Sequence, residues 1–542
     1  MDAVTRVPEP ANEPVLFYPP GSAERAAVEK ELVAQAAQQL DLPMTIGGRE
    51  VMGGGAPIEV VQPHARHEVL GVMRGATHAD AQAAIDAALA AAPGWRELSF
   101  DDRAAIFLTA AELLAGPWRQ VLNAATMLGQ SKTAYQAEID SACELIDFWR
   151  FNVHYAREIL ADQPPRNAPG VWNRTDHRPL EGFVYAITPF NFTAIAGNLP
   201  TAPALMGNTV IWKPSPTQTL AAHLTMRLLE AAGLPPGVVN LLTGDGIAVS
   251  EVALTHPELA GIHFTGSTGT FRSLWRTVAE NLDIYRTYPR LVGETGGKDF
   301  VLAHPSADVD VLRTALVRGA FEYQGQKCSA ASRGYIPQSL WRTLRDDLVA
   351  TTESLTAGPI TDFSNFMGAV IDERAYTKHV AAIERARSAP GVAILAGGRY
   401  DDKEGWFIRP TILLAEDPDD ESFGTEYFGP ILSLHVYPDE QYDDVVRQLE
   451  AVAPYALTGS VIARDRTAIA ATMRTLRFAA GNFYVNDKPT GAVVGQQPFG
   501  GARASGTNDK AGSALNLLRW TSARSIKETF LPPTAHRYPH QE

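Results

Sequence analysis

The chain has very little cysteine, since Cys143 and Cys328 are the only two in 542 residues. Two thiols cannot build a disulfide framework, and they are too few for a metal site made of thiolates. We therefore expect no metal site. A reducing, cytoplasmic compartment is the simplest interpretation of this cysteine content.

Long apolar runs are also missing. Pro, Gly or Asn interrupts the apolar stretches well short of the roughly 18 residues that a membrane-spanning helix needs, so we expect no membrane span. The N-terminal stretch contains acidic residues and prolines but no apolar core, which argues against a signal peptide.

Positive charge is in deficit. Lys and Arg number 47 against 61 Asp and Glu, which gives a formal net charge of −14. Nucleic acids and anionic membrane surfaces bind basic surfaces, so we expect neither as a partner. The net charge says little about a small acidic substrate, because local groups would bind it.

The remaining composition is that of a folded protein, with 45% apolar and 20% charged residues. A chain of this length predicts two or three domains. Apolar residues recur at helical spacing in three early segments, 79–91, 102–115 and 138–160. Residues 161–180, rich in Pro, Asn and Arg, are typical of a loop or an exposed hairpin.

The apolar pattern changes after residue 180. Four segments have the composition of buried strands: 182–191, 209–215, 238–244 and 261–267. A helix is predicted between the second and third. Alternating strands and helices predict a doubly wound parallel sheet. The alternation restarts after Gly297, which predicts a second α/β domain.

Cys328 lies among small and polar residues in 321-FEYQGQKCSAASRG-334. A free cysteine is commonly a small buried filler. A neighbouring cation such as Lys327 lowers the pKa of a thiol, which favours a nucleophile instead. The local sequence leaves both interpretations open, whereas Cys143 lies in an apolar helical stretch and is assigned to the core.

Two further polar residues are candidates for chemistry. Glu294 lies among glycines in 292-VGETGGKD, where it is either a base near a reacting centre or a polar turn residue. Asn191 ends the strand pattern ITPFN, where its amide could stabilise an oxyanion or simply cap a helix.

Two strand ends are candidates for ligand contacts. Lys213 ends a predicted strand, at the edge where open α/β sheets bind ligands, although a solvated strand end is the plainer interpretation. The turn 264-FTGSTGTF contains Gly266, Ser267 and Gly269 before a helix, so its free N–H groups could bind phosphate. Most such turns are only turns. The segment 244-GDGIAV lacks the third glycine of a dinucleotide fingerprint and is left as a turn.

Taken together, the motifs ITPFN, WKPS, FTGS, GETGGK and EYFGP, in this order, resemble the aldehyde dehydrogenase superfamily over about residues 40–525. Within it, 138-EIDSACELIDFWRFN and 495-GQQPFGGARASGTNDKAG resemble the L-glutamate-γ-semialdehyde dehydrogenases of proline catabolism. The resemblance implies an α/β fold with a Rossmann-like NAD-binding domain, a second α/β catalytic domain and a small β-hairpin oligomerisation element.

The resemblance also implies roles for named residues. Cys328 would be the nucleophile, Asn191 the oxyanion donor and Glu294 the base that activates water. NAD would contact nine residues: Thr188, Pro189, Lys213, Ser215, Gly266, Ser267, Gly269, Glu426 and Phe428. L-glutamate-γ-semialdehyde would contact six: Glu144, Phe192, Ser329, Gly491, Ala492 and Phe499.

The resemblance further divides the chain. Residues 1–39 would form an N-terminal extension, 40–160 with 181–296 the NAD-binding domain, and 297–511 the catalytic domain. Residues 161–180 and 512–542 would form the oligomerisation hairpin and tail, which implies a homodimer or a higher oligomer. Proline dehydrogenase is a possible functional partner.

Three alternatives stay open. The enzyme could oxidise another acid semialdehyde, or the chain could be a non-catalytic scaffold on the same fold. The third is a reductive γ-glutamyl phosphate reductase, which Glu294 argues against, because a base for hydrolysis has no use in that reaction.

Overall fold

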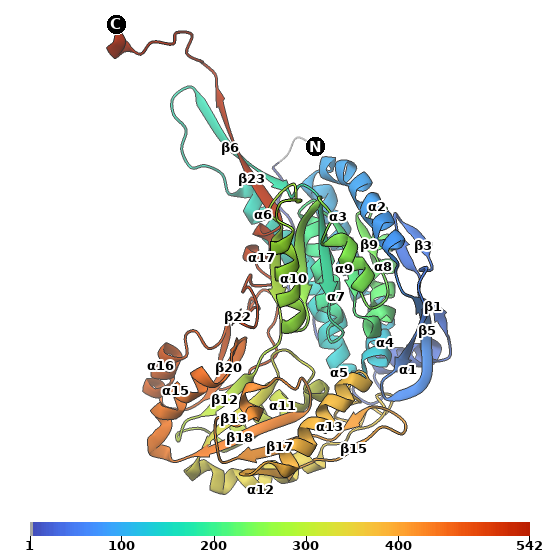
Figure 1. Ribbon diagram of the computed structural model, residues 1–542, viewed down its shortest axis with the longest axis vertical. Helices are drawn as coiled ribbons and strands as arrows, with labels where there is room; N and C mark the ends of the chain where they lie inside the picture. Colours follow the sequence, from blue (N-terminus) through green and yellow to red (C-terminus); the bar gives the residue numbers. More distant parts are fainter. Residues whose placement is uncertain (1–3) are drawn as a thin grey trace.

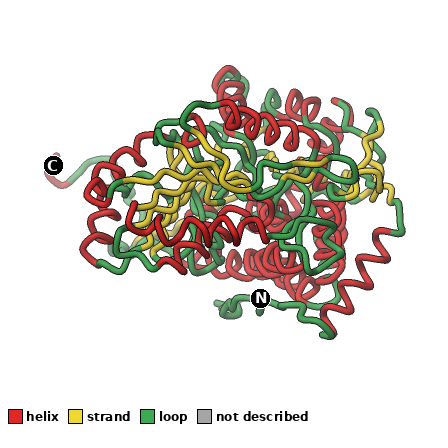
Figure 2. Tube along the Cα trace, turned by 90° about the horizontal axis from the view of Figure 1, so that it is seen from below, coloured by secondary structure: helices red, strands yellow, loops and turns green. Residues whose placement is uncertain are grey.

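The computed structural model describes residues 4–542, which form two sheet-containing parts and a narrow ribbon that projects from them (Figure 1). Strands run through the interior with helices outside them (Figure 2). Among the described residues, no helix combines the length and apolarity that crossing a membrane requires.

The first sheet has seven strands in the order β11-β10-β7-β8-β9-β2-β3. Five of them are parallel neighbours, and β2 and β3 continue the sheet antiparallel. Their bounds are β2 Met44–Ile46, β3 Arg49–Val51, β7 Phe183–Thr188, β8 Thr209–Pro214, β9 Val239–Leu241, β10 Leu259–Thr265 and β11 Arg290–Glu294. The four strands predicted between residues 182 and 267 are therefore confirmed.

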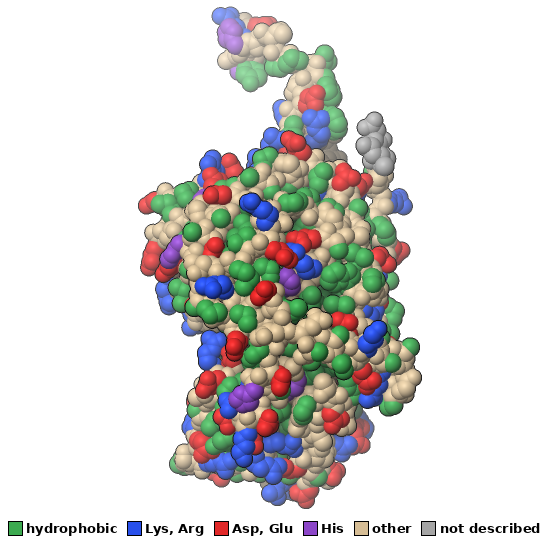
Figure 3. Space-filling model, turned by 90° about the vertical axis from the view of Figure 1, so that its right-hand side faces the viewer, with side chains coloured by type: hydrophobic (Ala, Val, Ile, Leu, Met, Phe, Trp, Pro, Cys, Tyr) green, Lys and Arg blue, Asp and Glu red, His purple; other side chains and the backbone are tan. Residues whose placement is uncertain are grey.

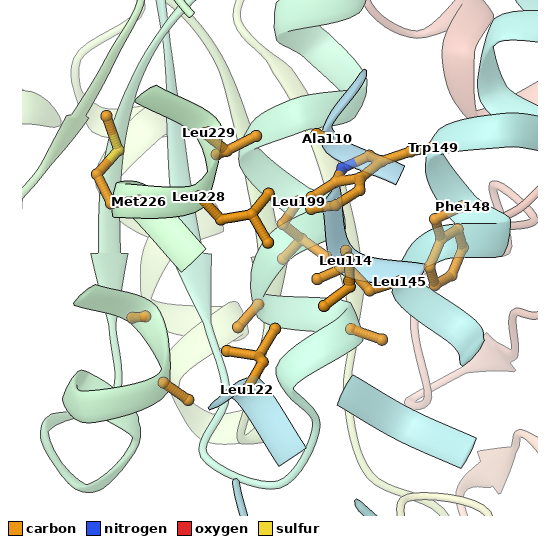
Figure 4. Close-up of a cluster of buried hydrophobic side chains, with 14 of the residues drawn as sticks. Ala110, Leu114, Leu122, Leu145, Phe148, Trp149, Leu199, Met226, Leu228 and Leu229 are labelled. Carbon is orange, nitrogen blue, oxygen red and sulfur yellow. The ribbon is translucent and has the colours of Figure 1, made fainter. Parts of the chain in front are cut away.

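Alternating side chains of these strands enter two different cores, which explains their nearly continuous apolar sequences. Phe183 and Tyr185 face one core with helices α2 (His78–Glu97), α9 (Ile247–Ala253) and α10 (Thr268–Glu280). Val184 and Ala186 face the other core, with helices α3 (Phe100–Ala115), α6 (Leu145–Ala161), α7 (Thr193–Leu205) and α8 (Thr219–Ala231). Figure 4 shows Leu114, Trp149, Leu199 and Leu228 together in this second core.

The helix predicted over 138–160 is interrupted by a wider turn. A short helix α5 (Ala134–Ala137) continues into a π-helix, η1 (Glu138–Glu144), before α6 begins. The apolar spacing does not reveal this change. Single π-helical turns occur often at functional sites, and η1 ends at Glu144, a predicted substrate contact.

The second sheet also has seven strands, in the order β14-β17-β18-β13-β12-β20-β21. Their bounds are β12 Asp299–Ala303, β13 Ala331–Pro337, β14 Val392–Ala396, β17 Thr411–Ala415, β18 Ile431–Tyr437, β20 Thr458–Ile462 and β21 Asn482–Val485. Helices α11 (Val309–Phe321), α12 (Gln338–Ser354), α13 (Glu373–Ser388), α15 (Tyr442–Val452) and α16 (Arg466–Thr475) accompany them (Figure 1). The second α/β unit expected after Gly297 is present.

The projecting ribbon pairs two distant segments. Strand β6 (Val171–Pro179) lies antiparallel to β23 (Thr521–Thr529) over their whole length, from Val171 opposite Thr529 to Pro179 opposite Thr521 (Figure 1). The Pro- and Arg-rich break at 161–180 is thus a loop followed by a strand outside the core.

The N-terminal residues pack against the first unit. Helix α1 (Ala23–Ala36) contacts α4 (Arg119–Gln130) and buries Val28 and Leu32. A smaller sheet of β1 (Leu40–Asp41), β5 (Ala65–Arg74) and β4 (Pro57–Gln62) follows.

The face of the molecule in Figure 3 carries basic and acidic side chains interspersed, without a continuous basic patch.

Leu114 provides a test of the packing of the second core, because its side chain is fully buried there. We expect Leu114→Ala to cost about 2–5 kcal/mol of stability, the usual range for a Leu→Ala change in a core. The midpoint of thermal unfolding should fall clearly. Val33→Ala is the matched control, because Val33 is 72% exposed; an equal fall in both variants would contradict this packing.

Candidate active site

A cavity of about 410 Å³ lies beside Cys328, whose side chain is partly exposed in it. All six residues predicted for the substrate line this one cavity: Glu144, Phe192, Ser329, Gly491, Ala492 and Phe499. They come from five separate segments of the sequence, so the fold brings them together.

A strained turn places Cys328 at the cavity. After α11 ends, Tyr323 and Gln324 have φ of 52° and 54°, a left-handed conformation that costs free energy for residues other than glycine. The buried Gln324 amide holds this turn, because it donates to the carbonyls of Ser131 (2.9 Å) and Ala369 (2.6 Å).

The pKa of the Cys328 thiol is raised, contrary to the expectation from Lys327. Burial is the main cause, followed by the carboxylates of Asp299 and Glu294. The Lys327 ammonium is buried and pairs with Glu322, Nζ to Oε2, at 3.3 Å. A basic neighbour in the sequence is therefore no guide to the charge around this thiol.

Asn191 lies next to the cysteine turn. Its side chain is 3% exposed, and Nδ2 donates to the carbonyl of Gln326, two residues before Cys328, at 3.0 Å. An amide has two N–H donors, and the bond to Gln326 uses one of them. Asn191 does not cap α7 here; Asp140 accepts from the first N–H groups of that helix instead.

Glu294 is the last residue of β11 and is held by the C-terminal segment. Its Oε2 accepts from the backbone N–H of Gly501 at 3.2 Å. Burial raises the pKa of this carboxyl well above its usual value, while the Gly501 N–H and the Lys510 cation lower it and Asp509 raises it. A raised pKa suits a carboxylate that accepts a proton near neutral pH.

Sequence reasoning missed a buried ion pair below Phe192. Lys132 Nζ lies 2.5 Å from Asp140 Oδ2, and both side chains are buried. The same ammonium lies over the rings of Phe192 (4.1 Å) and Tyr323 (4.4 Å), as a cation–π contact. Asp140 lies within the motif 138-EIDSACELIDFWRFN, but nothing in the sequence marks Lys132, eight residues earlier, as its partner.

Two of the residues predicted for the cofactor lie at the ends of β7 and β8. Lys213 is 4% exposed, and its Nζ donates to the carbonyls of Pro214 and Gly244 at 2.5 Å each. Burial lowers the pKa of Lys213 to about 7. Thr188 accepts from the indole of Trp212 at 3.0 Å, and the N–H of Ser215 donates to the Thr188 carbonyl. The 244–246 turn is thus a partner of Lys213.

The turn containing Gly266, Ser267 and Gly269 lies at the start of α10. Ser267 is the N-cap and accepts from the N–H of Thr270 at 3.1 Å. The turn is exposed or half-exposed, so its backbone is accessible. A helix start with free donors is suited to a phosphate group.

Glu426 and Phe428 approach from the second unit. Glu426 Oε1 accepts from the N–H of Gly297 at 2.9 Å, and burial raises its pKa. Phe428 has a φ of 59°. The Nε2 atom of the buried His379 lies 3.0 Å from the carbonyl oxygen of Tyr427 and 3.2 Å from that of Phe428. His379 was not found from the sequence, because nothing around it signals a ligand site.

These residues fit a dinucleotide. The ends of β7, β8, β10 and β11 share one edge of a parallel sheet, where such ligands bind. The α10 turn offers donors to phosphate, and Lys213 with Glu426 offers a donor and an acceptor for ribose hydroxyls. Among residues 4–542, no group of three or more His, Cys, Asp or Glu side chains is arranged to hold a metal ion.

The chain belongs to the aldehyde dehydrogenase family, whose pattern matches residues 51–526. This confirms the resemblance inferred from the motifs, and with it the fold class.

Three similar proteins have names that are more specific than the family name. The chain is 48% identical to the mitochondrial delta-1-pyrroline-5-carboxylate dehydrogenase of Dictyostelium discoideum, over 99% of this chain and 97% of that protein. It is 47% identical to the human enzyme of the same name, over 96% and 92%. A crystal structure of the Mycobacterium tuberculosis delta-pyrroline-5-carboxylate dehydrogenase bound with NAD has a TM-score of 0.97 and 65% identity, with both chains fully covered.

Lys510 provides a test of the electrostatics around Glu294. Its ammonium donates to the carbonyls of Gly481 (2.8 Å) and Gly500 (3.0 Å) and lowers the pKa of the Glu294 carboxyl. We expect Lys510→Met to raise that pKa, so the acidic limb of the pH–rate profile for aldehyde oxidation should move to higher pH.

Lys510→Arg is the control for this prediction, because it keeps the positive charge and should restore the position of the limb. A profile that loses amplitude in Lys510→Met without moving along the pH axis would assign Lys510 a packing role only.

Proposed function

We propose that this protein oxidises L-glutamate-γ-semialdehyde, formed from Δ1-pyrroline-5-carboxylate, to L-glutamate with NAD as oxidant. The observation that carries the proposal is a single cavity lined by the Cys328 thiol and by a half-buried carboxyl group, Glu144. The relatives named for pyrroline-5-carboxylate support it, since similarity to them extends over almost the whole chain.

The first step is attack by the Cys328 thiolate. The sulfur bonds to the aldehyde carbon, and the carbonyl electron pair moves to oxygen, which gives a thiohemiacetal. The second N–H of the Asn191 amide and the N–H of Cys328 would stabilise this oxyanion. Burial and nearby carboxylates raise the pKa of the thiol, so a higher pH is needed to form the thiolate.

The second step forms a thioester. The oxyanion regenerates the C=O bond as the hydrogen leaves carbon with its electron pair. The hydride acceptor would be supplied by bound NAD. Lys213 and Glu426 would bind the ribose groups, Ser267 with the α10 turn the pyrophosphate, and Phe428 would pack against the nicotinamide side. Thr188, Pro189 and Ser215 would line the same cleft.

The third step is hydrolysis of the thioester by water. Glu294 would accept a proton from water as its oxygen attacks the acyl carbon, and the C–S bond then breaks to release Cys328. The Gly501 N–H keeps one oxygen of Glu294 in place. A base that activates water is needed only if the thioester is hydrolysed. Glu294 therefore favours oxidation over a reductive reaction, which has no hydrolysis step.

The far end of the cavity suits the amino-acid group of the substrate. Burial and Asp140 raise the pKa of Glu144 to about 8, so an ammonium group beside it would stabilise its ionised form. The Ser329 hydroxyl, which lies 2.7 Å from the Thr490 hydroxyl, and the N–H groups of Gly491 and Ala492 would bind the carboxylate. Phe192 and Phe499 would flank the aliphatic chain.

The assembly of the protein follows as a further part of the proposal. The domain division inferred from the sequence is supported by the two separate sheets, and the ribbon of β6 and β23 projects where a second copy could pair with it (Figure 1). We infer a homodimer or higher oligomer.

One solved relative, proline utilization A of Bdellovibrio bacteriovorus, has 29% identity, and this chain spans 54% of it. This similarity supports proline dehydrogenase as a functional partner.

The location stays a prediction. We propose a reducing, cytoplasmic compartment on the low cysteine content of the sequence. The names of several relatives place those proteins in mitochondria.

The direct test measures NADH formation with NAD, and NADPH formation with NADP, from Δ1-pyrroline-5-carboxylate, succinate semialdehyde and propanal. We expect kcat/KM to be highest for pyrroline-5-carboxylate with NAD. Equal or higher values for succinate semialdehyde would indicate another acid semialdehyde as the substrate. No turnover of any aldehyde would indicate a non-catalytic protein.

Cys328→Ala should abolish NADH formation, because the other thiol at the cavity, Cys143, is buried, and burial and Glu138 raise its pKa. NAD binding should be largely kept, since the residues proposed for the cofactor are unchanged; quenching of tryptophan fluorescence measures this. Cys143→Ala, which removes the buried second thiol, is the control and should retain turnover. Activity of Cys328→Ala close to that of the unmodified enzyme would remove Cys328 from the mechanism.

A further inference from the structure

The N-terminal segment reaches the substrate cavity, although the sequence of residues 1–39 predicts only an extension. Residues 12–18, here called the strap, have no helix or strand. Asn12, Glu13 and Val15 line the cavity together with Cys328 and Glu144. The strap is therefore one wall of the proposed site.

Asn12 joins two other walls of this cavity. Its Nδ2 donates to Asp147 Oδ2 and to the carbonyl of Val494, each at 2.8 Å. Its Oδ1 accepts from Gln496 Nε2 at 3.0 Å. Asp147 lies on α6, whereas Val494 and Gln496 lie in the loop 490–497. The Asn12 amide thus links the loop to the helix through three hydrogen bonds.

The linked loop contains the proposed carboxylate donors, Gly491 and Ala492. It has no regular secondary structure, and Gly491 has a φ of 102°. Such a loop keeps one conformation only if contacts outside it supply the free energy that ordering costs. Asn12 supplies such contacts at Val494 and Gln496, two and four residues beyond Ala492.

Asp147 is a strong acceptor for the strap. Its side chain is buried, and burial raises its pKa to about 6, so it is largely ionised at neutral pH. It accepts from Asn12 and, at 2.7 Å, from the backbone N–H of Glu13. Hydrogen bonds to an ionised acceptor are stronger than those between neutral groups.

Ion pairs also hold the strap against helices α4 and α6. Glu13 pairs with Arg119 at 2.5 Å and with Arg150 at 2.8 Å, from α4 and α6. Arg119 also pairs with the fully buried Glu138 and donates to the carbonyl of Pro14 at 2.8 Å.

Glu138 connects the strap to the π-helix. Its carboxylate accepts from the N–H of Leu16 at 2.9 Å and from the hydroxyl of Tyr18 at 2.7 Å. Glu138 is the first residue of η1, and Glu144 is the last. The strap is therefore attached to the element that presents Glu144 as well as to the loop that presents Gly491 and Ala492.

We propose that Asn12 is a positioning residue for the amino-acid end of the substrate, holding the loop 490–497 at a set distance from Glu144. The inference rests on the proposed function and extends it to a residue outside the family motifs. Asn12 touches neither the thiol nor Glu294, so it acts on recognition and not on bond making. An aldehyde without an amino-acid group does not use these contacts.

Asn12→Ala tests the proposal through substrate choice. Loss of hydrogen bonds that order the loop should lower kcat/KM for Δ1-pyrroline-5-carboxylate about tenfold, mainly through KM, on the scale of one or two hydrogen bonds. The kcat/KM for propanal and the KM for NAD should stay within about twofold of the unmodified enzyme. Glu9→Ala is the matched control, because Glu9 is exposed and lies three residues earlier in the chain.

Gln496→Ala approaches the same contact from the loop and keeps the test valid if Asn12→Ala folds poorly. It removes one of the three hydrogen bonds, so a smaller loss with the same selectivity is expected. The double variant should lose less than the product of the two single losses, because both changes break one contact.

Three results would overturn the proposal: an equal fall for propanal and pyrroline-5-carboxylate, no fall for either, or independent effects in the double variant. Failure of the proposed function has a different signature. In that case the unmodified enzyme itself shows no preference for pyrroline-5-carboxylate over propanal or succinate semialdehyde.

Discussion

The buried pair of Lys132 and Asp140 is the interaction on which the geometry of the site depends. Asp140 lies in the π-helix and accepts from the N–H groups of Thr193 and Ala194 at 3.0 and 2.8 Å, so it caps α7 directly after Asn191 and Phe192. Lys132 contacts the rings of Phe192 and Tyr323. One ion pair thus joins the segments that present the oxyanion donor, the nucleophile and Glu144.

This pair specifies an arrangement more than it adds stability. Taking two charges out of water costs several kcal/mol per ion, and their attraction repays this only with good geometry and further hydrogen bonds. Asp140 meets that condition through the helix cap. Removing either partner would leave a buried charge, so the arrangement of α7, the π-helix and the cysteine turn is strongly determined.

Backbone strain accompanies this arrangement at two places where chemistry is proposed. Tyr323 and Gln324 precede Cys328 in a left-handed conformation, and Phe428 beside the proposed nicotinamide position has one too. Buried side chains, Gln324 and His379, compensate with hydrogen bonds to backbone groups. Such strain persists only where surrounding contacts determine it, which fits a site built before substrate binds.

The sequence predicts the regular parts of this molecule well, because strands of a parallel sheet are apolar on both faces and motif residues lie at their ends. Phe183–Thr188 and Thr209–Pro214 were recognisable for that reason. The π-helix and the strap were not, because they depend on buried polar contacts between distant residues, such as Asn12 with Val494. The expectation that Lys327 lowers the pKa of the Cys328 thiol was wrong for the same reason, since its pairing with Glu322 is apparent only after folding.

The proposed function depends on covalent acyl transfer to Cys328 and on release of the acyl group by Glu294. The most direct measurement is mass spectrometry of Glu294→Gln, acid-quenched after mixing with Δ1-pyrroline-5-carboxylate and NAD. We expect a glutamate-derived acyl group on the peptide that contains Cys328, formed with one NADH per site and slow to hydrolyse. An unmodified Cys328 after NADH has formed, or an acyl group on Cys143 instead, would contradict it.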